Sequence, residues 1–191
     1  MTGDAVSRLP PLPTAACGEA ERALLRGHLS QADRYLTGEP DAPPIPPILG
    51  LLARNPRLGG AWLAFSGTLI DGSSLPARDR ELLILRVGHR TRSRYLSAQH
   101  LSMGAQAGLD PHQCQALLGE ADAYPWCERD RHLVRAADEM VDEQMMSDAT
   151  WAGLRTSFDE GQLLEVLFVV GSYACLAMVL NSVGLEPARE E

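Results

Sequence analysis

An apolar stretch of 18 residues dominates the C-terminal part of the sequence: LLEVLFVVGSYACLAMVL, residues 163–180. A membrane-spanning helix needs about 20 predominantly apolar residues with cationic anchors at its ends. This stretch is shorter, contains Glu165, Ser172 and Tyr173, and has no directly flanking lysine or arginine. We therefore predict no membrane partner, but a helix buried on all sides, inside a bundle or at a subunit interface. So much apolar surface needs a cover, which argues against a monomer.

Helical signals also fill the chain from residue 48 onward. Asn55-Pro56 and Asp110-Pro111 each place an N-cap before a proline at the first helical position, and Ser147 is a third cap. No run with the period of a β-strand occurs. The pattern predicts an all-α protein with short connections between antiparallel helices. The expected helices cover about residues 56–70, 77–90, 94–107, 128–146 and 159–184, with short ones beginning at 111 and at 147.

The N-terminal part has a different organisation. Residues 19–36 show the apolar spacing of one helix. The next segment, EPDAPPIPP (39–47), has five prolines in nine residues and can form neither a helix nor a central strand. We predict two parts: residues 1–47 as an N-terminal helix with a proline-rich arm, and residues 48–191 as a helical domain.

Charge and motif content exclude several classes of function. Acidic residues outnumber basic ones by 25 to 17, the formal net charge is −8 and the pI is about 5.1. Binding to nucleic-acid phosphates is therefore not expected. Neither a glycine-rich phosphate loop nor a dinucleotide fingerprint occurs, and no spacing of His, Cys, Asp or Glu fits a metal site. We predict no cofactor and no metal.

Cysteine usage predicts the cellular compartment. No two cysteines form a CxxC, and the first twenty residues hold three prolines and no continuous apolar segment of a signal peptide. We predict a cytoplasmic protein with four free thiols: Cys17, Cys114, Cys127 and Cys175.

Two residues stand out as candidates for proton transfer. Glu81 precedes LLIL in a helix that is apolar nearly all round, so its carboxylate either pairs with a cation or has a raised pKa. The alternative is an ordinary first-turn carboxylate that pairs with Arg78 or Arg80. His100 lies in a helix of mixed composition. An imidazole there can act as an acid or base, or it is a hydrogen-bonded structural histidine.

A resemblance emerges over residues 80–109, RELLILRVGHRTRSRYLSAQHLSMGAQAGL. The segment resembles the core motif of the carboxymuconolactone decarboxylase family, which shares its fold with alkylhydroperoxidase D. NPRLGGAWLAF (55–65) and YACLAMVLNSVGLE (173–186) resemble the early and closing helices of that family. The similarity extends over about residues 45–187. It implies an all-α, alkylhydroperoxidase D-like helical bundle that forms a homo-oligomer, a trimer or a hexamer.

The peroxidase branch of this family uses a glutamate, the two cysteines of a CxxC and a histidine. The resemblance places these at Glu81, Ser93, Leu96 and His100, so the acid and the histidine match but both cysteines are missing. Thiol peroxidase chemistry needs a thiolate and a resolving thiol. A peroxidase is therefore excluded at this position unless a cysteine from elsewhere in the chain folds in.

We therefore predict a cofactor-free lyase or isomerase that resembles carboxymuconolactone decarboxylase and acts on a small cyclic carboxylate by His/Glu proton transfer. His100 and Glu81 are the predicted catalytic residues, with Glu81 tuning or relaying protons to His100. Tyr95 and Gln99 would orient the substrate, and Arg86, with Arg94, would hold its carboxylate. Ser93 completes the predicted substrate-binding set, together with the two residues that only the resemblance implies, Tyr173 and Asn181.

The chain departs from the family pattern around Tyr95. It has Arg94, Leu96 and Ser97 where family members often carry acidic or aromatic residues. Arg94 also clusters with Arg90 and Arg92, either as a cationic entrance for a carboxylate or as a solvated loop. These departures favour another metabolite as substrate, or an alternative function in which the fold is a non-catalytic, oligomeric ligand-binding protein.

Overall fold

The computed structural model describes residues 7–187, and within them every regular element is a helix and none is a strand. The all-α prediction is confirmed. Contacts divide the chain into two compact units, Met1–Ser73 with Val183–Glu191, and Ser74–Ser182. The predicted division of the chain after residue 47 differs from this division after Ser73, and it stays a prediction.

The first unit is built from short helices around a small apolar cluster. Its elements are the 3-10 helix η1 (Thr14–Ala16) and the helices α1 (Glu19–Leu25), α2 (Ser30–Asp33), α3 (Pro47–Leu52) and α4 (Pro56–Ile70). Helix α4 packs against both α1 and α3. The buried cluster runs from Cys17 and Leu25 to Leu49 and Leu63, so the N-terminal segment shares its core with α3 and α4.

The single helix predicted over residues 19–36 is wrong, because α1 ends at Leu25 and α2 begins only at Ser30. Gly27 interrupts it with a φ of +82°, a left-handed conformation that glycine adopts without steric cost. The segment after it brings the backbone of His28 against α4, where a Cβ at Gly67 would collide with the His28 carbonyl oxygen. Apolar spacing continues through the interruption, so periodicity alone could not reveal it.

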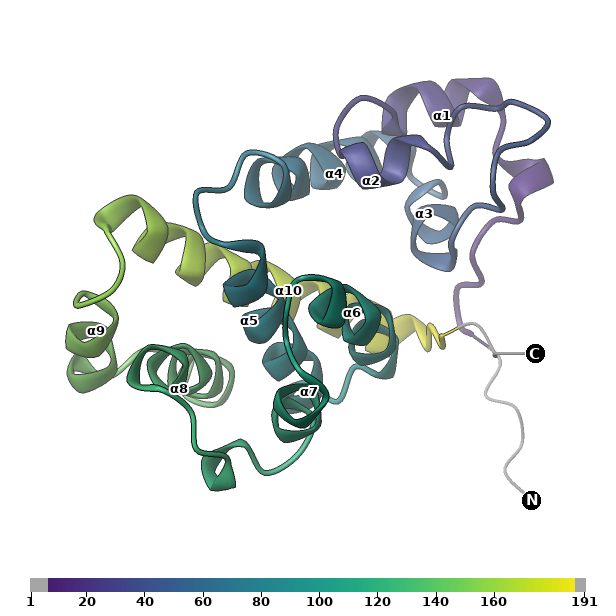
Figure 1. The fold of residues 1–191 in the computed structure, drawn as a ribbon. Helices are drawn as coiled ribbons and strands as arrows, with labels where there is room; N and C mark the ends of the chain where they lie inside the picture. Colours follow the sequence, from purple (N-terminus) through teal and green to yellow (C-terminus); the bar gives the residue numbers. More distant parts are fainter. Residues whose placement is uncertain (1–6, 188–191) are drawn as a thin grey trace, which may run out of the picture. The chain divides into compact units, whose positions relative to one another are not determined.

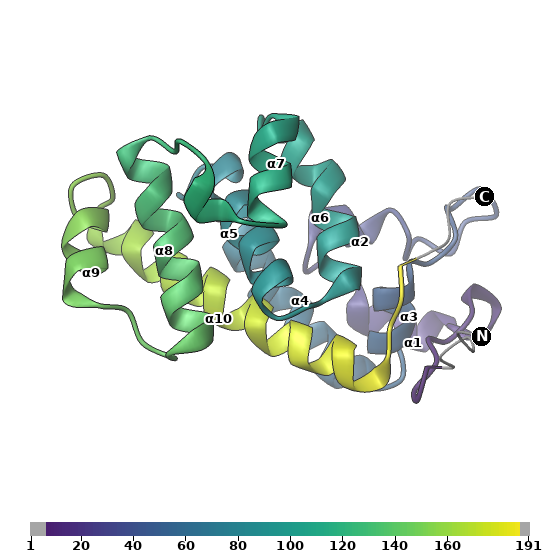
Figure 2. The ribbon, with the colours of Figure 1, turned by 90° about the horizontal axis from the view of Figure 1, so that it is seen from below.

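The second unit surrounds one central helix. Its elements are α5 (Ala77–Arg90), α6 (Arg94–Gln106), α7 (Pro111–Leu117), η2 (Ala121–Ala123), α8 (Glu128–Asp142), α9 (Asp148–Leu154) and α10 (Glu160–Val183). Helix α5 contacts α6, α7 and α8. Figures 1 and 2 show it between α6 on one side and α8 on the other. This position makes α5 the structural axis of the unit.

Helix starts follow the predicted caps. The side chain of Asn55 accepts a hydrogen bond from the amide of Leu58, and Asp110 forms a capping box with Gln113. Ser147 accepts from the amide of Thr150. These contacts satisfy amides that the first turn of a helix leaves without partners. Helix ends were predicted less well, since α8 stops at Asp142 rather than near residue 146.

Helix α10 is buried on one face only, so the prediction of burial on all sides within the chain is wrong. Leu163, Val166 and Val170 are buried, whereas Leu164 and Phe168 are about half exposed, at 54% and 49%. The helix, visible along its length in Figure 2, is long and apolar enough to cross a membrane by length and composition, and 39% of its most apolar window is buried. Burial at a subunit interface stays a prediction.

Candidate functional site

Helix α5 carries the candidate acid in its buried middle. Residues 79–88 of this helix are all buried, because α6 and α8 pack on it. Glu81 is 5% exposed, as expected from the apolar residues that follow it. A carboxylate in such a position needs a partner to offset its loss of hydration.

The partner of Glu81 is His100 on α6. Oε2 of Glu81 lies 2.8 Å from Nδ1 of His100, and His100 is 7% exposed. The alternative in which Glu81 pairs with Arg78 or Arg80 is therefore wrong. Among the described residues no hydrogen bond engages Nε2 of His100. A carboxylate on Nδ1 fixes the orientation of the imidazole and leaves Nε2 as the nitrogen that can exchange a proton.

Tyr173 on α10 completes a cluster of three helices. Its ring meets the imidazole of His100 edge-on, with the ring centroids 5.2 Å apart and the planes at 89°. Burial and the charge of Glu81 raise the pKa of the Tyr173 phenol, with Arg80 acting in the opposite direction. The phenol is therefore protonated at neutral pH and can donate a hydrogen bond.

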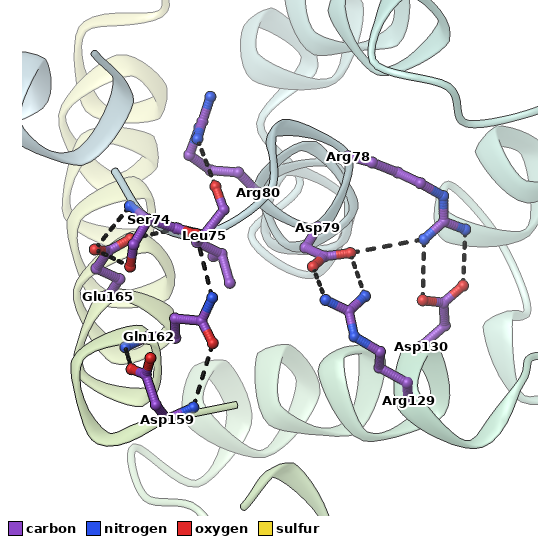
Figure 3. A network of polar contacts seen from close by, with 10 residues as sticks. All are labelled: Ser74, Leu75, Arg78, Asp79, Arg80, Arg129, Asp130, Asp159, Gln162 and Glu165. Carbon is purple, nitrogen blue, oxygen red and sulfur yellow. Dashed lines mark hydrogen bonds and ion pairs between the residues drawn. The ribbon is translucent and has the colours of Figure 1, made fainter. Parts of the chain in front are cut away.

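A polar network holds the start of α5 in place (Figure 3). Asp79 forms a two-pronged ion pair with Arg129 on α8, and Arg78 does the same with Asp130, at 3.0 and 2.7 Å. On the other side, Glu165 of α10 accepts hydrogen bonds from the residues just before α5, Ser74 and Leu75. The network ties the start of α5 to α8, and the residues just before α5 to α10, two to seven positions before Glu81. Sequence reasoning missed it, although alternating Arg and Asp at 78–80 was a visible signal.

Arg86 has a structural role instead of the predicted one. Its Nε and Nη2 donate to the two carboxylate oxygens of Asp138 at 2.6 and 2.8 Å, and Nη1 donates to the carbonyls of Leu117 and Gly119. The guanidinium is buried and every nitrogen has a partner. This geometry fastens α5 to α8 and uses four of the five N–H donors, which does not favour the predicted binding role.

The remaining predicted residues have mixed surroundings. Ser93 and Tyr95 are buried, whereas Arg94 and Gln99 are exposed, so Tyr95 and Gln99 do not share one environment. The hydroxyl of Ser93 is enclosed and makes no hydrogen bond within residues 7–187. Asn181 donates to the carbonyl of Thr91 at 2.8 Å and so links α10 to the turn after α5. The structure thus brings together Glu81, His100 and Tyr173, and it leaves the substrate roles of the others as predictions.

The predicted cationic entrance consists of Arg90, Arg92 and Arg94, and these arginines have different surroundings in the structure. Arg90 pairs with Asp138 and Asp142 on α8. Arg92 is exposed in the turn between α5 and α6, where its φ is +56°. Of the three arginines, Arg90 therefore already forms ion pairs with carboxylates of α8.

A separate apolar groove of about 560 Å³ lies between α6 and α7. Its lining residues are Leu101, Ala105, Pro111, Cys114, Gln115 and Leu118. None of them belongs to the cluster of Glu81, His100 and Tyr173. The groove is therefore separate from that cluster.

No thiol occupies the positions of the peroxidase cysteines, since these hold Ser93 and Leu96. The free cysteines are Cys17 and Cys114, which are buried, and Cys127 and Cys175, which are exposed. In the part of the chain that the structure describes, no three His, Cys, Asp or Glu side chains gather as a metal site would require. The expectation that the protein uses no metal or cofactor stays a prediction.

Comparison with known proteins gives a family match and a shared fold. Residues 56–139 match the model of the carboxymuconolactone decarboxylase family, and no curated protein matches the chain. An uncharacterised peroxidase-related protein from Silicibacter sp. TM1040 is similar in structure, with a TM-score of 0.77 and 19% identity over 98% of this chain and 95% of that one.

Two further structures share the fold. One is an uncharacterised peroxidase-related protein from Ralstonia eutropha JMP134, described as an alkylhydroperoxidase AhpD core, with a TM-score of 0.78 and 17% identity over 97% of this chain and 94% of that one. The other is a protein of unknown function from Agrobacterium tumefaciens, a putative antioxidant defence protein AhpD. Its TM-score is 0.65, at 16% identity over 73% of this chain and 96% of that one. The expected alkylhydroperoxidase D-like fold is confirmed.

Proposed function

We propose that this chain, whose residues 56–139 form a carboxymuconolactone decarboxylase family domain, is a cofactor-free lyase or isomerase acting on a small cyclic carboxylate. The observation that supports it is the buried pair of Glu81 and His100, with 2.8 Å between Oε2 and Nδ1. A carboxylate that binds one ring nitrogen of an imidazole orients the ring and leaves the other nitrogen available for general acid–base catalysis. The absence of cysteine at 93 and 96 directs the proposal away from peroxide reduction.

The proposed chemistry moves one proton at a carbon next to a carbonyl group. In a decarboxylation, the bond to the carboxylate carbon breaks, carbon dioxide leaves, and its electron pair becomes an enolate that protonated His100 then protonates on carbon. In an isomerisation, neutral His100 first removes a proton, which exchanges with solvent, and then delivers a proton to another carbon. In both, Glu81 stabilises the imidazolium through its Nδ1–H.

Tyr173 has a supporting role in this proposal. Its neutral phenol is a hydrogen-bond donor beside His100. A donor placed where negative charge develops stabilises an enolate more than the ground-state ketone. Tyr173 would therefore lower the barrier without carrying the transferred proton.

The test incubates a metabolite extract in D₂O with the wild type, His100→Ala and Glu81→Gln, followed by untargeted mass spectrometry. We expect a carboxylate that disappears only with the wild type, and a product that carries deuterium at the protonated carbon. A product that is lighter by carbon dioxide identifies a lyase. A product whose mass is unchanged apart from its deuterium identifies an isomerase. His112→Ala and Glu120→Gln, on exposed residues of the same types, are the controls. Full turnover by His100→Ala would refute the proposal.

The non-catalytic alternative has one observation in its favour, the apolar groove between α6 and α7. A binding protein would retain a metabolite from the extract and return it unchanged. Retention without conversion, unaffected by His100→Ala, would replace the enzymatic proposal with this one.

We also propose that the protein is a cytoplasmic homo-oligomer that assembles through α10. Five of the exposed residues of this helix fall at intervals of four and three: Leu164, Phe168, Gly171, Cys175 and Met178. That spacing places them on one stripe and is the repeat by which helices pack along each other. A second copy of the same helix offers a matching stripe, so the cover expected for this helix is another protomer.

A further inference from the structure

Arg80 differs from Arg86, the other buried arginine among the described residues of the second unit. It is 9% exposed, and its one hydrogen bond runs from Nη1 to the carbonyl of Leu75 at 3.1 Å. Its Nε is fully enclosed and makes no hydrogen bond to any described residue. No carboxylate within residues 7–187 forms an ion pair with it. Arg80 thus keeps a buried positive charge without a counter-charge.

Such a charge is costly, since burial removes the hydration that a guanidinium has in water. Two other arginines of α5 offset the loss of hydration by pairing with a carboxylate. Arg78 has Asp130, and Arg86 has Asp138, each in a two-pronged arrangement. Figure 3 shows Arg78 and Asp79 directed toward α8 and Arg80 directed away from their partners. The fold therefore leaves Arg80 outside the network that neutralises the other cations.

The unpartnered edge of Arg80 has the geometry of a carboxylate receptor. With Nη1 engaged by Leu75, the donors that remain are Nε and Nη2, which lie along one side of the planar guanidinium. Arg86 uses the same two atoms to hold the carboxylate of Asp138, at 2.6 and 2.8 Å. A planar carboxylate can accept two parallel hydrogen bonds from such an edge once the side chains that enclose Nε move aside, and this arrangement gives orientation as well as affinity.

Arg80 also lies close to the proposed reaction site. It immediately precedes Glu81 on α5, and its charge and that of Glu81 both act on the phenol of Tyr173. Tyr173 in turn contacts the ring of His100. The charge of Arg80 therefore lies beside the cluster of Glu81, His100 and Tyr173.

We propose that the Nε–Nη2 edge of Arg80 is the binding site for a carboxylate group of the ligand that reacts at His100. The inference rests on the proposed function for the identity of that ligand, but it requires only that a carboxylate binds. It assigns to Arg80 the role that sequence reasoning gave to Arg86 and Arg94. Arg80 is a binding residue and takes no part in the proton transfer.

The test is direct observation of the Arg80 Nε–H group by ¹H–¹⁵N NMR of the full-length protein. Acetate and benzoate serve as carboxylate probes and benzamide as the neutral counterpart of benzoate. The Arg80 signal is assigned by its loss in Arg80→Lys. We expect acetate or benzoate to shift this signal downfield in a saturable manner, while benzamide leaves it unchanged. If neither carboxylate shifts it, or if benzamide shifts it equally, the proposal is wrong.

Variants then measure the contribution of the charge. We expect Arg80→Met to weaken benzoate binding by about 10- to 100-fold, in line with the loss of a charge-assisted pair, and Arg80→Lys to restore part of it. Arg155→Met changes the net charge equally at an exposed position and should leave the affinity unchanged. If Arg155→Met weakens binding as much as Arg80→Met, the effect is non-specific and the proposal fails.

One further variant separates this proposal from the proposed function. His100→Ala should abolish turnover but retain the benzoate-induced shift at Arg80. A protein that binds benzoate at Arg80 yet converts no metabolite would refute the enzymatic proposal alone. A protein that turns over a carboxylate with an unperturbed Arg80 signal would refute the carboxylate site alone.

Discussion

Nδ1 of His100 and Oε2 of Glu81 lie 2.8 Å apart, although 19 positions separate the two residues in the sequence. The packing of α6 on α5 creates this pair, and its consequence is testable by removing only the charge. Glu81→Gln keeps an acceptor for Nδ1–H but cannot stabilise an imidazolium. We expect turnover to fall by about 10²- to 10⁴-fold, with Nδ1 of His100 still carrying its proton in ¹⁵N spectra of the ring. A variant with wild-type turnover would exclude Glu81 from catalysis.

The buried ion pair between Arg86 and Asp138 should dominate the stability of the second unit. We expect Arg86→Met to lower the free energy of unfolding by about 3 kcal/mol, because the partly buried Asp138 keeps only the 3.5 Å contact to Arg90 and the carbonyls of Leu117 and Gly119 lose a donor. Urea denaturation measures this difference. Arg90→Met removes the exposed partner of Asp142, with side chains 34% and 42% exposed, and a 3.5 Å contact to Asp138, which keeps Arg86. This variant should cost at most about 1 kcal/mol. Equal costs would show that burial does not govern these pairs.

The carboxyl group of Glu139 should make the free energy of unfolding depend on pH. Burial raises the pKa of its carboxyl, but hydrogen bonds donated by Ser147 and Thr150 outweigh burial and lower the pKa overall. A depressed pKa in the folded state stabilises the protein above the unfolded value of about 4.3, and this contribution disappears as the pH falls through the folded pKa. Glu139→Gln should therefore be less stable than the wild type at pH 7, and the two should converge in acid. A pH-independent difference in urea midpoints would contradict this.

The exposed stripe of α10 should control assembly. Met178 is 63% exposed there, and a glutamate at this position would place a charge between two packed helices. We expect Met178→Glu to reduce the oligomer to monomers in analytical ultracentrifugation. Met145→Glu is the matched control, since Met145 is 67% exposed on another part of the chain, and it should assemble as the wild type does. A monomeric wild type, or equal dissociation of both variants, would contradict the proposed interface.

Cysteine modification should leave activity intact. Burial raises the pKa of the Cys114 thiol, so iodoacetamide at mildly alkaline pH should label the exposed Cys127 well before Cys114. Peptide mass spectrometry reads the order of labelling. Turnover of the carboxylate should survive complete labelling of Cys127. Loss of activity in step with any one thiol would return a cysteine to the mechanism and favour the peroxidase alternative.

The sequence by itself predicted the starts of several helices and the two residues of the buried Glu81–His100 pair. Helix periodicity and caps are local properties of neighbouring residues, and so Asn55, Asp110 and Ser147 begin helices as predicted. Glu81 and His100 were identified by residue type and by a motif resemblance, and the structure joins them. Tyr173 was implied by the resemblance alone, and it packs on the same imidazole.

Only the tertiary structure decided which charges meet. Arg78, Arg80 and Arg86 are chemically equivalent in the sequence, but α8 brings carboxylates to the first and last of them and none to Arg80. The same holds for α10, whose composition is apolar all round although only one face finds a partner within the chain. The physical reason is that periodicity fixes which residues share a face of a helix, whereas the partner of that face depends on contacts between segments that are far apart in the sequence.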